Sequence, residues 1–194
     1  MSCWARKSNV WGCEVIETEQ TVIIGAPIEA VWDYVQDVAK WADLMPGLQD
    51  CAVIDTHNSR WSLKVGVGAL VRAVKVNVCV DAWDGPERVK FSFRLEGDPV
   101  RGGGTYMARA KSGQETDVTL TLQVSGSGPM APMWEAMGKP LLPQFAKAFA
   151  GQLKERIEGA VANGVMAAAP RGWRGFYGWL KRVCETLLGS TSKV

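Results

Sequence analysis

The chain has 194 residues, of which 47% are hydrophobic and 22% charged, and its formal net charge is +2. This composition is typical of one ordinary folded domain with short extensions, and the small net charge gives no reason to expect a nucleic acid or an acidic protein as partner. The five cysteines are scattered without a CxxC pair, which argues against a metal site, and their odd number argues against a disulfide framework. We therefore expect a reducing, cytoplasmic setting.

Neither a secretory signal nor a membrane-spanning helix is predicted. Residues 1–7 lack the apolar core of a signal peptide. No run approaches the ~18 apolar residues that are needed to cross a bilayer. Residues 1–13 show no clear period and are interpreted as an N-terminal arm, in which Trp4 and Trp11 either pack on the domain or lie at an interface.

One strand and two short helices are predicted next. Residues 14–24 are rich in Thr, Val and Ile, which favours a strand. Pro27 suits the first turn of a helix whose apolar residues would be buried over residues 28–35. A second helix over residues 38–44 is expected to stop at Pro46, because proline cannot continue a helix.

Six further strands are predicted, because apolar and polar residues alternate in short segments that turn residues separate. Such alternation is typical of antiparallel strands with one buried and one wet face. A turn is expected at residues 57–59, and the glycines at 102–104 are interpreted as a hairpin turn. The six segments are residues 51–55, 61–65, 74–81 (in a run that residues 84–86, Asp-Gly-Pro, are expected to end), 89–95, 105–111 and 118–124.

The last predicted element of the domain is a long helix from Pro132 to Ala162. Its apolar residues recur three or four apart, and Lys, Glu and Gln fill the opposite side. Pro140 and Pro143 suit a first turn, so the firm part of the helix is predicted to begin near Pro140. No strand can bury its apolar face alone, so we expect an α+β fold in which about seven antiparallel strands curve around this helix. The inward residues either enclose a cavity for an apolar ligand or fill a solid core.

Several segments carry a resemblance to known proteins. The order of elements, with residues 26–32 (Ala-Pro-Ile-Glu-Ala-Val-Trp) opening the first helix, resembles the START-like helix-grip superfamily (polyketide cyclase, Bet v 1-type). Within that superfamily, the chain is similar to the CoxG-like family of carbon monoxide dehydrogenase proteins at residues 44–47 (Leu-Met-Pro-Gly), 65–69 (Val-Gly-Val-Gly-Ala) and 102–105. The resemblance covers about residues 14–160.

The resemblance implies a fold and a function that composition and spacing do not show. It implies a START-like, non-catalytic ligand-binding domain over residues 14–162, which carries a lipophilic quinone between sheet and helix and has no covalent cofactor. It also implies peripheral association with the inner membrane and service to a molybdenum hydroxylase of the carbon monoxide dehydrogenase type. Two alternatives stay open: a polyketide cyclase-like enzyme, and an assembly factor for such a hydroxylase.

Enzyme signatures are absent from the sequence. His57, the single histidine, falls in a polar turn and is interpreted as a surface residue rather than a catalytic base. The sequence contains no Gly-x-Ser-x-Gly, Walker or HExxH pattern. No catalytic residue and no metal ligand are therefore predicted.

The candidate ligand site follows from strand parity and helix phase. Methionine is adaptable, and Trp and Phe are broad, which suits a flat or long apolar ligand. Tyr106 is the one polar-tipped residue that is predicted to point inward from a strand, and its hydroxyl donates either to a ligand carbonyl or to backbone. The candidate residues are Met45, Trp61, Phe93, Tyr106, Met133, Met137, Leu141 and Phe145.

Residues 163–170 are interpreted as a linker and residues 171–194 as an amphipathic tail helix. The large apolar residues of the tail fall on one stripe beside basic residues, which is the pattern of a helix that lies in the plane of a membrane surface. A helix packed on its own domain or on a partner protein shows the same pattern, so these alternatives stay open. The predicted membrane-binding residues are Arg171, Trp173, Arg174, Phe176, Trp179, Leu180, Lys181 and Arg182.

Overall fold

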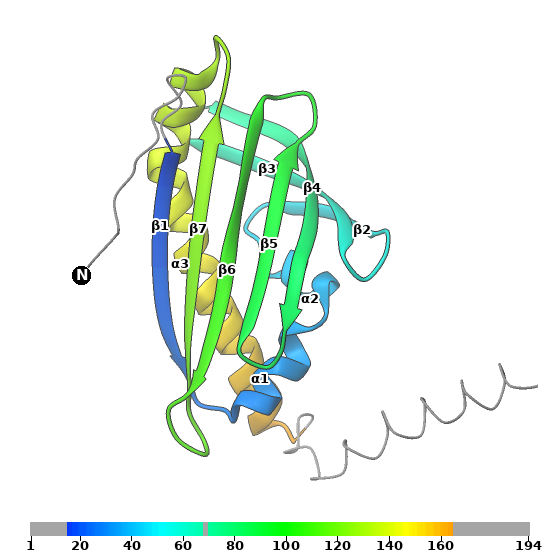
Figure 1. Cartoon of the computed structure of the whole chain (residues 1–194), viewed down its shortest axis with the longest axis vertical. Coiled ribbons are helices and arrows are strands. Elements are labelled where there is room, and N and C mark those ends of the chain that lie inside the picture. Colours follow the sequence, from blue (N-terminus) through cyan, green and yellow to red (C-terminus); the bar gives the residue numbers. More distant parts are fainter. Residues whose placement is uncertain (1–14, 68–69, 165–194) are drawn as a thin grey trace, which may run out of the picture.

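The computed structural model describes residues 15–67 and 70–164, in which a seven-stranded antiparallel sheet curves around one long helix (Figure 1). The strand order is β1-β7-β6-β5-β4-β3-β2, so only the connection that leaves β1 crosses the sheet. The predicted helix-grip architecture is confirmed. The elements are β1 (Val15–Ile24), α1 (Ile28–Val35), α2 (Val38–Asp43), β2 (Leu48–Val53), β3 (Asn58–Val67), β4 (Leu70–Asp84), β5 (Arg88–Leu95), β6 (Val100–Ala110), β7 (Thr116–Gly126) and α3 (Ala131–Ala162).

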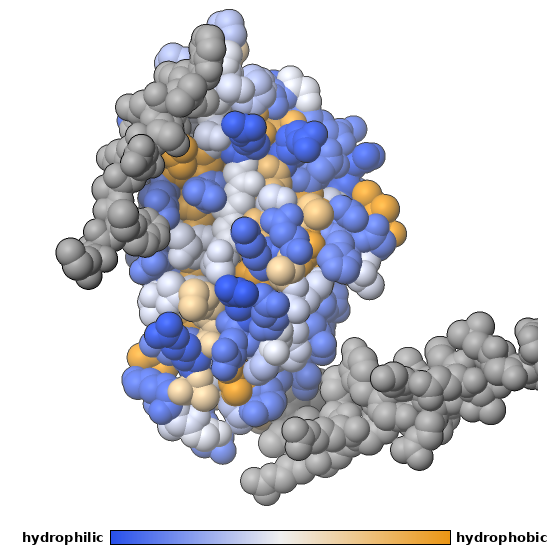
Figure 2. All heavy atoms as spheres, in the orientation of Figure 1, coloured by the Kyte–Doolittle hydropathy of each residue, from blue (hydrophilic) through white to orange (hydrophobic). Residues whose placement is uncertain are grey.

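The alternation along each strand sorts its side chains between the inner and outer faces of the sheet. In β4, every second residue from Val74 to Val80 is a valine that is at most 7% exposed, whereas Lys75 is exposed. The outer face shows polar and apolar side chains intermingled (Figure 2). Because one face is apolar throughout, the sheet has to be covered on that side.

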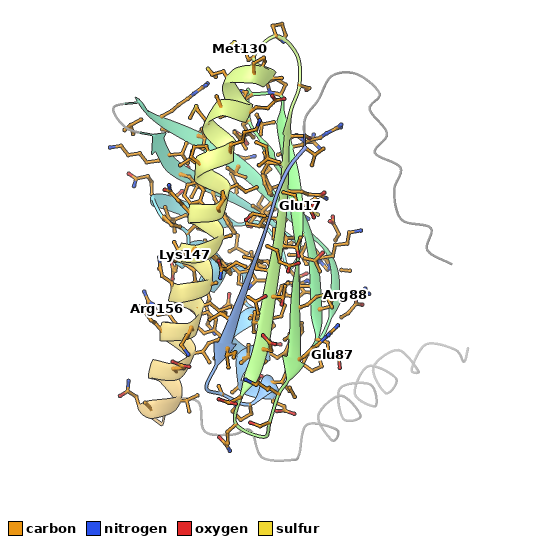
Figure 3. All side chains as sticks on the ribbon, turned by 90° about the vertical axis from the view of Figure 1, so that its left-hand side faces the viewer. Glu17, Glu87, Arg88, Met130, Lys147 and Arg156 are labelled. Atoms are coloured by element: carbon orange, nitrogen blue, oxygen red, sulfur yellow. The ribbon has the colours of Figure 1, made fainter. Side chains whose placement is uncertain are left out.

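The covering element is α3, which packs along β1 and β7 (Figures 1 and 3). The two segments approach closely at Gly138, where an added Cβ atom would lie 2.7 Å from Cδ1 of Ile16. The buried residues of α3 recur on one side, from Trp134 through Ala146 to Ile157. The helix therefore covers the inner face of the sheet along its β1–β7 side.

The helix α3 differs from its prediction at its start. It runs without a break from Ala131, with Pro132 in the first turn and with Pro140 and Pro143 inside it, so the firm helix does not begin near Pro140. Both internal prolines are exposed on the side that faces away from the sheet. Proline lacks an N–H group, so it leaves a carbonyl oxygen of the preceding turn without its helical hydrogen bond. The free-energy cost is smallest where water can reach that oxygen.

The glycines at 102–104 do not form a hairpin turn, because they lie inside β6. Gly102 faces Phe93 and Gly104 faces Phe91 across the β5–β6 pair. A Cβ atom on Gly104 would lie 2.8 Å from the Phe91 ring, and one on Gly102 would overlap the Phe93 ring. The glycines thus make room for two aromatic rings that lie over the strand.

Smaller shifts affect the hairpin between β2 and β3 and the length of β4. The turn lies before Asn58, because a carboxylate oxygen of Asp55 accepts hydrogen bonds from the backbone N–H groups of His57 (2.7 Å) and Asn58 (2.8 Å). The strand β4 begins at Leu70, before the predicted Val74, and ends at Asp84, where the sequence predicts its end; a register shift lies between Val80 and Ala82. The predicted arm, residues 165–170 of the predicted linker and the predicted tail lie outside the described residues, and the domain boundaries stay predictions.

A polar contact joins the last turns of α3 to the connection between β1 and α1. Lys154 donates to the carbonyl oxygen of Ile23 (2.8 Å) and to the Glu158 carboxylate, which also accepts from the backbone N–H of Gly25 (2.7 Å). The hydrogen bond from Lys154, together with that from Gly25, lowers the pKa of Glu158.

We expect the substitution Glu158→Gln to lower stability near neutral pH by less than about 1 kcal/mol, because the carboxylate is partly exposed. The pKa of Glu158 is lower in the folded state than in the unfolded state, where it is about 4.3, so the ionised carboxylate stabilises the fold at pH values above about 4.3. This contribution disappears as the pH falls through the folded-state pKa. Urea unfolding of parent and variant should therefore converge in acid. Glu155→Gln, an exposed change on the same helix, is the control and should show no such convergence.

Candidate functional site

A cavity of about 210 Å³ lies between α3 and the inner face of the sheet. Its walls come from β1, β3, β4, β5, β6 and β7, from α3, and from α1 and α2 at one end. Tyr106 and Glu135 carry the only titratable side chains that line it among the described residues. The inward residues therefore enclose a space rather than fill a solid core.

Seven of the eight candidate ligand residues line this cavity. Met133 is the exception: it is half-buried and packs against the core without reaching the cavity. The turn of the helix brings its neighbour Trp134 to the wall instead. The structure shows where these side chains lie, and their role in binding stays a prediction.

Sequence reasoning missed four aromatic lining residues: Trp41, Phe91, Trp134 and Phe149. For two of them, the sequence pattern could have predicted a position on the cavity wall. Phe91 has the same strand parity as Phe93, and Phe149 is one helical turn after Phe145. The positions of Trp41 and Trp134 depend on how separate elements pack, so no local pattern reveals them.

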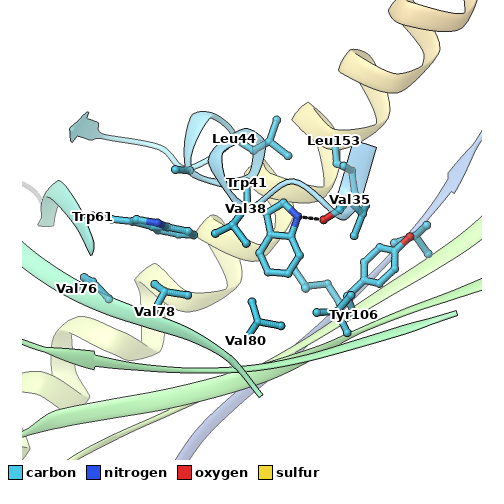
Figure 4. Packing of buried hydrophobic residues seen from close by; sticks show 14 of the residues in the cluster. Val35, Val38, Trp41, Leu44, Trp61, Val76, Val78, Val80, Tyr106 and Leu153 are labelled. Carbon is cyan, nitrogen blue, oxygen red and sulfur yellow. Dashed lines mark hydrogen bonds between the residues drawn. The ribbon is translucent and has the colours of Figure 1, made fainter. Parts of the chain in front are cut away.

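Helices α1 and α2 close one end of the cavity. The indole of Trp41 lies there with its Nε1–H donated to the Val35 carbonyl oxygen (2.5 Å) (Figure 4). Its ring also contacts Phe91, with 5.8 Å between centroids. Asp37 caps α2 by accepting from the backbone N–H of Ala39 (3.0 Å). The cap and the indole hydrogen bond hold α2 in the position that closes this end.

Trp61 lines the wall that β3 contributes (Figure 4). Its Nε1–H is donated to the hydroxyl of Ser59 (2.9 Å), which is 1% exposed. Both residues point inward because they are two apart on the same strand. This indole is thus satisfied within the protein, without a ligand.

Trp134 lies at the other end, near the start of α3. It packs on Gly126, where an added Cβ atom would be 3.1 Å from the Cβ of Trp134. The guanidinium of Arg72 lies 5.4 Å from the centre of the Trp134 ring, and Asp98 holds Arg72 in an ion pair at 3.1 Å. These contacts join β4, the β5–β6 loop and α3 around one indole.

The sequence of this domain matches a known protein family. Residues 15–158 match the family described as polyketide cyclase / dehydrase and lipid transport. The chain belongs to this family. The match confirms the predicted superfamily, whereas similarity to the CoxG-like family stays a prediction. None of the curated proteins compared with the chain is a significant match.

Solved structures of this fold extend the comparison. A conserved protein from Geobacillus kaustophilus superposes with a TM-score of 0.66 at 17% identity, over 75% of this chain and 97% of that one. A START superfamily protein from Mycobacterium smegmatis gives 0.56 at 15% identity, over 72% and 98%. The Zhui aromatase/cyclase from Streptomyces sp. R1128 gives 0.54 at 18% identity, over 76% and 98%. At these identities the likeness establishes the fold.

Within residues 15–67 and 70–164 of this polyketide cyclase-family domain, two polar atoms on cavity-lining residues lack a hydrogen-bond partner. They are the hydroxyl of Tyr106, whose residue is 3% exposed, and the Nε1 of Trp134, whose residue is 8% exposed. Burial raises the pKa of Tyr106, so its phenol stays protonated and able to donate. Both atoms are buried, and the cavity surface is almost wholly apolar, so neither donor is presented to the cavity space.

No other chemistry is evident in the part of the chain that the structure describes. His57 is exposed in the β2–β3 turn and contacts Thr56 through Nδ1 (3.0 Å). Within residues 15–67 and 70–164, no group of His, Cys, Asp and Glu side chains is arranged to hold a metal ion. No helix in the same ranges has an apolar stretch long enough to cross a membrane.

Proposed function

We propose that this protein binds and carries a lipophilic molecule, a quinone in the first instance, in the cavity between α3 and the sheet. The observation that carries the proposal is a cavity of about 210 Å³ with almost wholly apolar walls. Binding of an apolar ligand in such a cavity is favourable because it removes apolar ligand surface from water. The choice of a quinone as the ligand rests on the resemblance to the CoxG-like family. The choice of a molybdenum hydroxylase of the carbon monoxide dehydrogenase type as the partner rests on the same resemblance.

The proposal assigns no catalytic step to the protein. General acid–base catalysis needs a positioned group whose pKa lies near the working pH. Among the described lining residues, only Tyr106 and Glu135 titrate, and burial moves the pKa of Tyr106 upward, away from neutrality. A cyclase-type enzyme is the second candidate, since the Zhui aromatase/cyclase shares the fold. Turnover of a polyketide substrate by the purified protein would favour that candidate.

Residues 171–194 are proposed to attach the protein to the inner membrane. The support is the sequence pattern alone, in which basic residues flank a Trp, Phe and Leu stripe. Each basic residue near an anionic lipid contributes about 1 kcal/mol, so attachment should depend on anionic lipid and weaken in salt. Attachment to a partner protein, as in an assembly factor, is the competing possibility.

Organic extraction of the purified protein followed by mass spectrometry tests the carrier proposal. We expect an isoprenoid quinone or a similar neutral lipid to be recovered in stoichiometric amount. Trp41 and Trp61 line the cavity, so added quinone should also quench tryptophan fluorescence in a saturable manner. Protein that contains no lipid and shows no saturable quenching would contradict the proposal.

Vesicle flotation tests the tail. The full chain should float with vesicles that contain anionic lipid, and a variant that lacks residues 171–194 should stay at the bottom of the gradient. Neutral vesicles are the control, since the basic residues gain little from them. If the deletion leaves flotation unchanged, the tail is not the anchor. If it abolishes capture of a hydroxylase without lipid binding, the assembly role is favoured.

A further inference from the structure

A second hollow lies on the outer face of the sheet, the face that Figure 2 shows. It is a surface groove of about 870 Å³ that crosses β7, β6, β5 and β4, from the start of β1 to the β2–β3 turn. Val15 lines it at one end and Ile54 at the other, and these apolar residues are 56% and 62% exposed. Between these ends, polar side chains of the four strands line the groove, among them those of Arg94 and Arg101.

The two arginines lie directly opposite each other in the β5–β6 ladder. The register of the sheet places them in one row with Asn77 of β4 and Ser125 of β7, and Asn77 lies between two inward-facing valines. Side chains in such a row leave the same face of the sheet, and the Cβ atoms of a directly opposite pair are about 5 Å apart. Both arginines are exposed, so the centre of the groove presents two adjacent guanidinium groups to solvent.

No carboxylate neutralises this pair of arginines among the residues that the structure describes. The carboxylates closest in the fold are engaged elsewhere: Glu96 pairs with Arg60 at 2.9 Å, and Asp55 accepts hydrogen bonds within its own turn. Like charges directly opposite each other destabilise an antiparallel strand pair. An anionic partner that bridges the two guanidinium groups would remove this repulsion.

The surroundings of the arginines favour a short acidic segment of a protein over a polyanion. Asp55 lines the groove, and Glu17 lies opposite Gln123, which also lines it. A nucleic acid or an anionic membrane would bring negative charge against these carboxylates as well as against the arginines. Arginine binds carboxylates through two parallel hydrogen bonds, and protein interfaces are enriched in arginine.

The length of the groove suits an extended peptide segment. Neighbouring strands are about 4.8 Å apart, so the five steps from β1 to β3 cover about 24 Å, which about seven residues of extended chain span. Residues 1–14, which precede Val15, do not complement the arginines in charge, because they contain Arg6 and Lys7 but only one acidic residue, Glu14.

We propose that this groove binds an extended acidic segment of a partner protein. Carboxylates of the segment bind Arg94 and Arg101, and its apolar side chains pack on Val15 and Ile54 at the two ends. The groove and the cavity open on opposite faces of the sheet, so binding of the segment does not require a ligand in the cavity.

Fluorescence anisotropy of a synthetic peptide with the full-length protein tests the proposal. The probe is Leu-Ser-Glu-Ser-Glu-Ser-Glu-Ser-Leu, blocked at both ends and carrying a neutral label. In an extended chain its Leu and Glu side chains point the same way, and its Leu residues are about 26 Å apart. At low ionic strength it should bind at least about tenfold more tightly than the same peptide with Gln for Glu, and added salt should reduce the difference. Equal binding, or no binding of either peptide, would overturn the proposal.

Arg94→Gln and Arg101→Gln together should reduce the affinity for the Glu peptide about tenfold and leave that for the Gln peptide unchanged. Arg109→Gln is the matched control, because Arg109 is an exposed arginine on the same strand and face as Arg101, about 26 Å away, and has no ion pair within the described ranges. An equal effect of the control would show that the net charge, rather than the groove, attracts the peptide, and the proposal would be wrong.

The melting temperature separates binding from a structural role. Because the two arginines repel each other, the double Gln variant should melt at the parental temperature or above it. Arg101→Glu places opposite charges across the same ladder, so it should also keep or raise the melting temperature while it abolishes binding of the Glu peptide. A lower melting temperature of the double Gln variant would show that the arginines stabilise the sheet, contrary to the proposal.

Two further measurements on the double Gln variant address other occupants of the groove. It should float with anionic vesicles as the parent does, and it should have the parent's molar mass in light scattering. Weaker flotation would indicate that a membrane contacts the groove, and dissociation of a parental dimer would indicate a second copy of the chain. Either result would overturn the proposal.

Discussion

Val76→Trp is expected to reduce ligand affinity at least about 100-fold, or about 2.8 kcal/mol, while the protein remains folded. Val76 points inward from the middle of β4 and lines the cavity (Figure 4). An indole at this position occupies the space that the ligand would fill. Extra volume in a packed core costs about 1–3 kcal/mol, but here an existing cavity accepts most of it.

The measurement is displacement of a neutral fluorophore, together with the yield of lipid extracted from the purified variant. Lys75→Trp is the matched control, because it adds the same ring one residue away on the exposed face of the same strand. The control should bind as the parent does. If Val76→Trp retains the parent's affinity, the ligand binds elsewhere and the cavity is not the site.

Gly104→Ala is expected to lower the free energy of unfolding by about 1–3 kcal/mol, although it adds a single methyl group. The new Cβ atom would overlap the backbone oxygen of Thr121 and lie 2.8 Å from the Phe91 ring. The backbone oxygen cannot move without disturbing the ladder with β7. The Phe91 ring lines the cavity, so its displacement should change the shape of the cavity and lower ligand affinity as well.

Urea unfolding gives the stability, and fluorophore binding gives the affinity. Gly113→Ala serves as the control, because a Cβ atom there would meet nothing within 4 Å. This control should leave both measurements near the parental values. If Gly104→Ala is as stable as the parent, β6 tolerates a side chain at this position. The packing of the aromatic rings would then not require the glycine.

Local patterns predicted most of the elements and the faces that they bury. Strand alternation placed Trp61 and Tyr106 on the inner face, and helix phase placed Met137 and Phe145 toward the sheet. These predictions succeed because a strand has a side-chain period of two and a helix one of 3.6, whatever the rest of the chain does. The same patterns left open whether the inward residues surround a cavity or fill it.

The amino-acid sequence by itself determined the order of the elements, the apolar face of each, and the scarcity of charge on those faces. Only the tertiary structure decided that the glycines at 102–104 lie within a strand, because their neighbours Phe91 and Phe93 come from another strand. It also decided that Trp134 rather than Met133 reaches the cavity, and that the Tyr106 hydroxyl has no hydrogen-bond partner among the described residues. The physical reason is that periodicity is a property of one element, whereas a void or an unpaired donor depends on how several elements pack together.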